Sequence, residues 1–152
     1  MLLQPPGLSR PEMLPHWPYA QAVDEALTDR GIPPGTVRVE RSYPMHGDRM
    51  YIALIWDVSR CAGLGGICLT WHEETGWAHA LLRLSAANAI PLGPLTALHR
   101  VFAAPKDVAA VADSLVSRRY PLGRYEGEHH EEWDGALAVR ATIDAFHRGA
   151  AG

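Results

Sequence analysis

Apolar and polar residues alternate along two adjacent stretches near the middle of the chain. In the first stretch Ile67, Leu69 and Trp71 alternate with smaller or polar residues, and residues 77–82 continue the pattern. Side chains with a period of two lie on opposite faces of a β-strand, so both stretches are predicted to be strands. Residues 73–76, EETG, end in a glycine that accepts a positive φ. This is typical of a type I turn that closes a hairpin.

The predicted turn sets Trp71 opposite His79 and Leu69 opposite Leu81. The hairpin then has a bulky face, which carries Ile67, Leu69, Trp71, Trp77, His79 and Leu81. It also has a small-residue face, which carries Cys68, Thr70, His72, Ala78, Ala80 and Leu82. A helix would be able to approach the small-residue face closely. The bulky face is either core, because large aromatics supply much of a small domain's buried area, or a surface for a partner.

Apolar residues three or four positions apart predict three helices. The first covers residues 18–30, where a proline suits the first position and Gly31 follows the end. The second begins at Pro105 and stops before residue 120. The third covers residues 131–147. Its predicted core contacts are Trp133, Ala136, Leu137, Ala141 and Ile143 or Phe146.

Two further strands precede the hairpin. Residues 36–43 alternate valines with charged side chains, which predicts a half-buried strand near an edge of the sheet. Residues 50–56 are apolar on both faces, which predicts a central strand. Residues 85–102 fit either a helical turn or an irregular strand, because two prolines and a glycine interrupt residues 91–94.

The order of these elements predicts an α+β fold. Strands joined by short links favour an antiparallel meander of about four strands, with one N-terminal helix and two C-terminal helices. Helices at both ends of the chain are expected to pack on one face of that sheet. Residues 1–16 are rich in proline and lack periodicity, so they are predicted to form an extended or disordered arm. Residues 17–148 are then one α+β domain.

Composition and charge narrow the class of partner. The net charge is −3 and the chain has no basic tract, which argues against direct binding of nucleic acid. The N-terminus does not resemble a signal peptide, and no apolar stretch approaches the ~20 residues of a membrane span. Cys61 and Cys68 are the only cysteines. We expect free thiols in a reducing cytoplasm, although the spacing also permits a bridge between them.

Three stretches carry a resemblance to a known family. They are HWPYAQAVDEAL, WHEETGWAHALL and PKDVAAVADSLV. Together they resemble a family of actinobacterial domains of unknown function, over residues 16–119. The resemblance implies no activity, so it assigns no catalytic residue to this chain.

The densest group of potential metal ligands is HHEE at residues 129–132. Neighbouring residues on a helix point about 100° apart, so consecutive ligands rarely converge on one ion. Only His130 and Asp134 would share a helical face, and a zinc site needs a third ligand from elsewhere. We therefore interpret this segment as a solvated helix start, and we predict no metal and no cofactor.

The leading hypothesis is a non-enzymatic cytoplasmic module that binds a protein partner or itself, as a homodimer. The contact would be a sheet edge or the hairpin, with a binding surface of Trp71, Trp77, His79, Glu73 and Glu74. The alternative is a small-ligand or metal-binding enzyme that uses His46, Asp48, His72 or His79. The predicted register sets the last two histidines on opposite faces. A regulator that reaches DNA only through a partner also fits the charge.

Overall fold

The computed structural model describes residues 14–41, 49–61, 65–82, 89–117 and 128–151. Its elements are α1 (Trp17–Asp29), β1 (Thr36–Arg41), β2 (Met50–Trp56), the 3-10 turn η3 (Val58–Arg60), β3 (Gly66–His72), β4 (Gly76–Leu82), β5 (Ala89–Pro94), α2 (Pro105–Ser117) and α3 (Ala136–Ala151). The predicted α+β class and its order of helix, strands and two helices are confirmed.

The strands form one antiparallel meander in the order β1-β2-β3-β4-β5. The described sheet has five strands where the sequence predicted about four, because β5 lies in the stretch that the sequence left open. Proline cannot donate to a neighbouring strand, but an edge strand tolerates it. In β5, Pro91 pairs with Ala80 and Gly93 pairs with His79, so Leu92 is an extra residue that bulges from the ladder.

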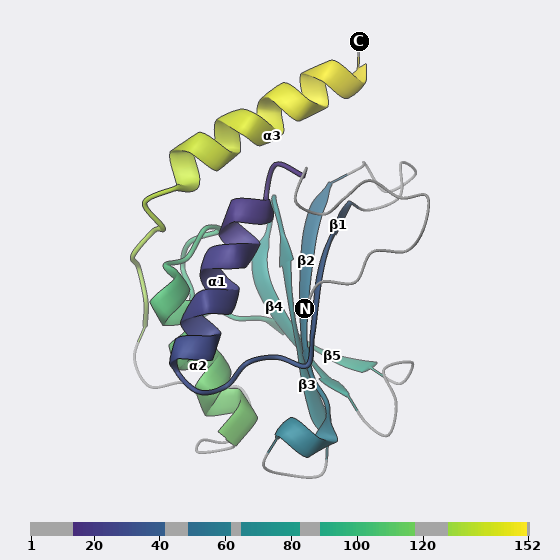
Figure 1. Cartoon of the computed structure of the whole chain (residues 1–152), viewed down its shortest axis with the longest axis vertical. Helices are drawn as coiled ribbons and strands as arrows, with labels where there is room; N and C mark the ends of the chain where they lie inside the picture. Colours follow the sequence, from purple (N-terminus) through teal and green to yellow (C-terminus); the bar gives the residue numbers. More distant parts are fainter. Residues whose placement is uncertain (1–13, 42–48, 62–64, 83–88, 118–127, 152) are drawn as a thin grey trace.

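Helices α1 and α2 lie on one face of the sheet, as predicted. Figure 1 shows α1 and α2 side by side on that face, with α3 running past one end of the sheet. The guanidinium of Arg41 lies over the Phe146 ring, 5.2 Å from its centre, and His147 contacts Glu73 at 2.8 Å. The last helix is therefore anchored near the β3–β4 turn and does not lie flat on the sheet.

The hairpin is confirmed, but its predicted register is wrong by two residues. Trp71 pairs with Trp77 and Leu69 pairs with His79. The difference arises because Gly76 already pairs with His72, which leaves a loop of only residues 73–75. Gly76 has a φ of +79°, the left-handed conformation that follows a type I turn in such hairpins. A shift by an even number of residues keeps every side chain on its predicted face.

The bulky face of the hairpin forms the core. Trp71 is 0% exposed and Trp77 is 3% exposed, and the helices cover this face and not the small-residue face. Tyr19 from α1 lies among the aromatic rings. Its hydroxyl donates to the Ala103 carbonyl at 2.7 Å and accepts from Trp77 Nε1 at 3.0 Å. One helix, the hairpin and the loop before α2 are thus joined at a single side chain.

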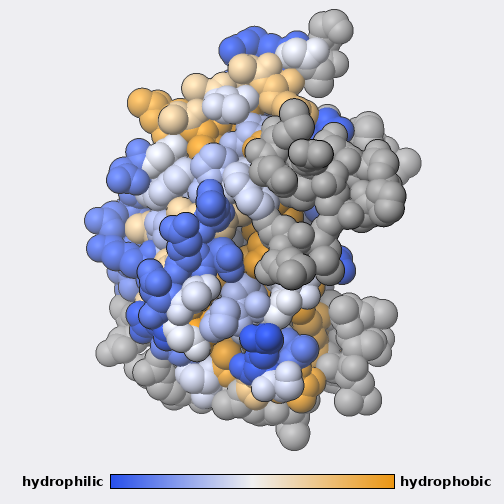
Figure 2. Space-filling model, in the orientation of Figure 1, coloured by the Kyte–Doolittle hydropathy of each residue, from blue (hydrophilic) through white to orange (hydrophobic). Residues whose placement is uncertain are grey.

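The two ends of the described chain differ from the prediction. Leu14 and His16, assigned to the arm, are buried in the core. The last helix begins at Ala136, five residues later than predicted. Its buried side includes Val139, whereas Leu137, a predicted core contact, is 80% exposed. Ala141 is also exposed, while Ile143 is buried as predicted. Figure 2 shows apolar residues at the surface over α3.

Replacing Gly76 with alanine is expected to lower the free energy of unfolding by about 1–2 kcal/mol, because an L side chain is strained at positive φ. The added Cβ would also lie 3.2 Å from Val101 Cα. The control is Gly149→Ala in α3, where a Cβ meets nothing within 4 Å. That change is expected to stabilise the protein by about 0.5–1 kcal/mol. Urea unfolding measures both, and equal effects at the two glycines would contradict the turn geometry.

Candidate functional site

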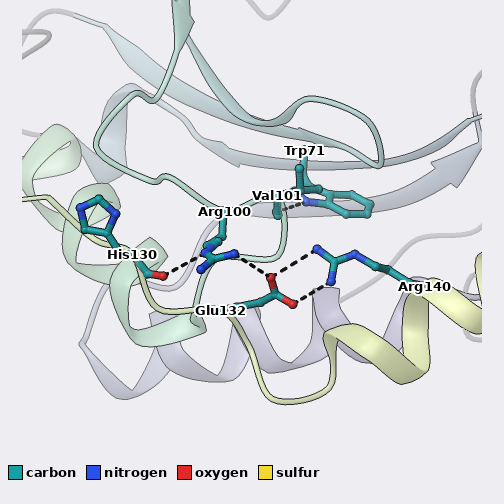
Figure 3. A network of polar contacts seen from close by, with 6 residues as sticks. All are labelled: Trp71, Arg100, Val101, His130, Glu132 and Arg140. Atoms are coloured by element: carbon teal, nitrogen blue, oxygen red, sulfur yellow. Dashed lines mark hydrogen bonds and ion pairs between the residues drawn. The ribbon is translucent and has the colours of Figure 1, made fainter.

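The aromatic pair of the predicted binding surface lies inside the protein. Trp71 donates from Nε1 to the Val101 carbonyl at 2.6 Å (Figure 3), and its indole stacks on the His16 ring at a centroid distance of 5.9 Å. A partner cannot reach Trp71 or Trp77 in the folded protein. Of the two interpretations of the bulky face, core or partner surface, the burial of these tryptophans supports the core.

The two histidines of the hairpin do lie on opposite faces. His79 is 6% exposed, and its Nδ1 donates to the Gly93 carbonyl at 3.0 Å. Burial lowers the pKa of His79. His72 lies on the small-residue face, where its ring meets the Tyr51 ring edge-on at 4.9 Å. These histidines do not form one site, and His46 and Asp48 lie outside the described residues.

The two glutamates of the turn differ in their surroundings. Glu73 is only 9% exposed, and its carboxylate accepts from the Met50 backbone N–H and from His147 Nε2, both at 2.8 Å. It therefore ties the turn to β2 and α3. Glu74 is 59% exposed and forms an ion pair with Arg49 at 3.0 Å. Glu74 is near the solvent, whereas Glu73 is a structural contact.

Neither Cys61 nor Cys68 is in a disulfide bond. The Cys61 thiol lies 3.7 Å from the Trp56 carbonyl. Cys68 is half-buried on the small-residue face, and burial raises the pKa of its thiol. The structure therefore has no bridge between Cys61 and Cys68, the alternative that their spacing permitted.

A pairing that the sequence did not predict sets residues 128–133 against residues 97–104. His129 N donates to the Ala97 carbonyl at 2.8 Å, and His99 N donates to the His129 carbonyl at 3.0 Å. Two further backbone bonds join Ala104 to Glu131 and Trp133 to Phe102. The HHEE segment is therefore extended and is not the start of a helix. In an extended chain, residues two apart lie on the same side.

This pairing brings together three exposed side chains, His99, Glu128 and His130, which we call the His99 cluster. One potential ligand atom from each residue lies within 4.8 Å of the other two. Nε2 of His99 is 3.7 Å from the carboxylate of Glu128, and Nε2 of His130 is 4.0 Å from it. The two imidazole rings stack at a centroid distance of 4.1 Å. Asp134, which a helical arrangement would pair with His130, is not part of this cluster.

Charged side chains of Arg100, Glu132 and Arg140 hold this segment in place (Figure 3). Arg100 donates from Nε to the His130 carbonyl at 3.1 Å, and its Nη1 lies 3.7 Å from the Glu132 carboxylate. Arg140 of α3 donates to the same carboxylate at 2.7 Å, and this hydrogen bond lowers the pKa of Glu132. His129 points to the other side of the segment, where it pairs with Asp107 at 3.2 Å.

Comparison with known families confirms one part of the resemblance, membership of a family of unknown function. The chain belongs to a family of unknown function, DUF6292, whose model matches residues 19–114. That range covers the sheet, nearly all of α1 and most of α2. It includes His99 but ends before Glu128 and His130. No curated protein and no solved structure matches the chain. In the described part of the chain, none of the helices combines the length and apolar character that a membrane crossing requires.

Proposed function

We propose that this DUF6292 protein is a non-enzymatic interaction module that forms a homodimer through the edge of β1. The observation that supports this is the contrast between the two edges of the sheet. β5 carries prolines and a bulge, features that hinder the addition of another strand. β1 has neither, and within the described residues it pairs with β2 alone (Figure 1). Such an edge offers backbone N–H and C=O groups to an added strand.

The charges on β1 favour a second copy of the chain as the added strand. Val37 and Val39 point into the core, whereas Arg38 and Glu40 are exposed. In an antiparallel β1–β1 pair centred on Val39, Arg38 of each copy lies opposite Glu40 of the other. Opposite charges directly across two strands contribute about 0.2–1 kcal/mol per pair. The two-fold axis repeats the pair, so the edge is complementary to itself.

Other features support an interaction role over the enzyme alternative. The enzyme alternative uses His72 and His79, which face away from each other in the structure. Catalysis needs groups that converge on one substrate. Cys61 and Cys68 are not joined by a disulfide, which fits a reducing compartment, so we propose a cytoplasmic location. The net charge of −3 supports a protein partner over direct contact with nucleic acid. An actinobacterial origin, implied by the resemblance, belongs to the same proposal.

Sedimentation velocity over a wide range of concentrations is expected to show a monomer–dimer equilibrium. With Arg38→Glu, a glutamate lies opposite a glutamate in each of the two cross-strand pairs. With Glu40→Arg, an arginine lies opposite an arginine in each of them. Each single change is expected to weaken dimerisation by about tenfold, from the loss of two attractive pairs and the gain of two repulsive ones.

The double variant Arg38→Glu/Glu40→Arg is the matched control, because it restores opposite charges across the interface. Its dimerisation is expected to return close to that of the unmodified protein. A monomer at every concentration would remove the homodimer proposal. A dimer that neither single reversal weakens would show that copies associate through another surface.

A further inference from the structure

The His99 cluster has the composition of a transition-metal site. We propose that His99, Glu128 and His130 bind one zinc ion. Two imidazole nitrogens and one carboxylate are a ligand set that zinc accepts, whereas calcium and magnesium prefer oxygen ligands alone. This inference does not depend on the β1 edge, which lies on a different part of the chain.

The ligand atoms are somewhat farther apart than in a tetrahedral site. Zinc lies about 2.0–2.2 Å from nitrogen and oxygen ligands, which sets neighbouring ligand atoms about 3.4 Å apart. Nε2 of His99 lies 3.7 Å from one oxygen of Glu128, and Nε2 of His130 lies 4.0 Å from the other oxygen. One ligand atom from each residue lies within 4.8 Å of the other two, so rotation of these exposed side chains brings the three groups onto one ion.

One of these movements is a change in the angle between the imidazole rings. The rings are nearly parallel, at 13°, so their Nε2 lone pairs do not yet meet at one point. Each ring must tilt about its side-chain torsions. The side chains are 36% exposed for His99 and 66% exposed for His130, and Glu128 is 69% exposed. Solvent leaves them room to tilt without displacing the core.

The backbone already holds the three residues on one side. Glu128 and His130 are two apart on an extended segment, and backbone bonds fix that segment beside His99. Arg100 further restrains the segment through the His130 carbonyl. Binding therefore has to order side chains but not backbone, which reduces its entropic cost.

Three protein ligands leave the fourth position of a tetrahedral ion open. Structural zinc sites usually use four protein ligands, whereas sites with three keep a position for water or an outside ligand. The structure therefore assigns the His99 cluster to the open class. The fourth ligand would be water or a donor group from a molecule that binds at this surface.

The test is a calorimetric titration of the tag-free protein with Zn²⁺. We expect one ion per chain. His99→Ala and His130→Ala are each expected to weaken binding by at least about tenfold, since loss of a ligand costs no less than loss of a residue that only orients one. The matched control is His129→Gln, which removes the neighbouring histidine that faces Asp107. Its affinity for Zn²⁺ is expected to stay within about twofold of the unmodified protein.

Co²⁺ in place of Zn²⁺ gives a second readout that needs no variant. We expect the strong visible absorption of a tetrahedral ion with nitrogen ligands, unchanged by excess Mg²⁺ or Ca²⁺. Circular dichroism checks that each variant is folded. Absence of saturable binding would overturn the proposal. So would binding that persists in both ligand variants, or that falls equally in the His129 control, because the ion would then be held by other surface groups.

Discussion

Replacing Trp71 with alanine is expected to lower the free energy of unfolding by about 3–5 kcal/mol, the range for large aromatics removed from a core. Trp71 is fully buried between the Tyr19 and Phe102 rings, at centroid distances of 5.5 Å and 5.1 Å. The change leaves a cavity there and removes the donor to the Val101 carbonyl. Since a domain of this size is stable by about 5–15 kcal/mol, much of the margin would be lost.

Two further variants separate the causes of this effect. Trp71→Phe keeps an aromatic ring but loses the indole N–H, so it reports on the hydrogen bond together with a smaller cavity. Leu137→Ala is the surface control, because Leu137 is 80% exposed, and its expected effect is within about 0.5 kcal/mol. Urea unfolding followed by circular dichroism measures all three. A loss at Trp71→Ala no larger than at Leu137→Ala would contradict the placement of Trp71 in the core.

The elements that the sequence predicted well are those fixed by local pattern. β2 has the predicted bounds, and α1 differs from its prediction by one residue at each end. Both have a clear hydrophobic period, and the first residues of α1 include a proline that suits a helix start. The register of the hairpin was missed because the sequence shows that Gly76 takes a positive φ but not whether it also pairs with the facing strand.

β5 could not be identified from its own residues. A central strand, which pairs with a strand on each side, does not tolerate residues such as Pro91, Gly93 and Pro94. Only the position of β5 at the edge of the sheet makes them acceptable. That position is a property of the whole fold. The same prolines and the bulge then distinguish the two sheet edges, which is the basis of the proposed homodimer.

The His99 cluster was missed for a related reason. A helical reading of residues 129–132 separates neighbouring side chains by about 100°, and it gives no role to His99. The segment is extended because residues 97–104 offer it backbone partners, and that contact joins parts of the chain far apart in sequence. The helix starts after Trp133 and Gly135, where the pairing ends. This delay also explains why Val139, and not Leu137, faces the core.

His16 is expected to make the protein less stable as the pH falls. Its ring is fully buried beside Trp71, and Nε2 donates to the Tyr51 carbonyl at 2.8 Å. Burial lowers the pKa of His16 from 6.5 to about 4, a shift that hydrogen bonds to backbone carbonyls and the charge of Glu73 only partly oppose. Within the described residues, Nδ1 has no hydrogen-bond partner. The folded protein therefore holds His16 neutral at pH values where the unfolded chain is already protonated.

The direction of this pH dependence follows from which state, folded or unfolded, binds the proton. Between pH 6.5 and about 4 the unfolded state carries a proton on His16 that the folded state lacks, so the free energy of unfolding falls as the pH falls. The stability that the protein gains by holding His16 neutral is fully present well above pH 6.5. About 3 kcal/mol of the free energy of unfolding is lost by pH 4. His16→Gln keeps an N–H donor but cannot titrate. Its baseline stability will differ, but its stability should decline less steeply over this window.

The comparison of the two slopes isolates His16 from the other titrating groups. Burial also lowers the pKa of His79, so that residue adds a decline of the same sign in both proteins. Urea unfolding at a series of pH values from 7.5 downwards gives the two curves. Parallel curves would mean that His16 is as easily protonated in the folded protein as in the unfolded chain. The N-terminal residues before α1 would then be too loosely packed against Trp71 to belong to the core.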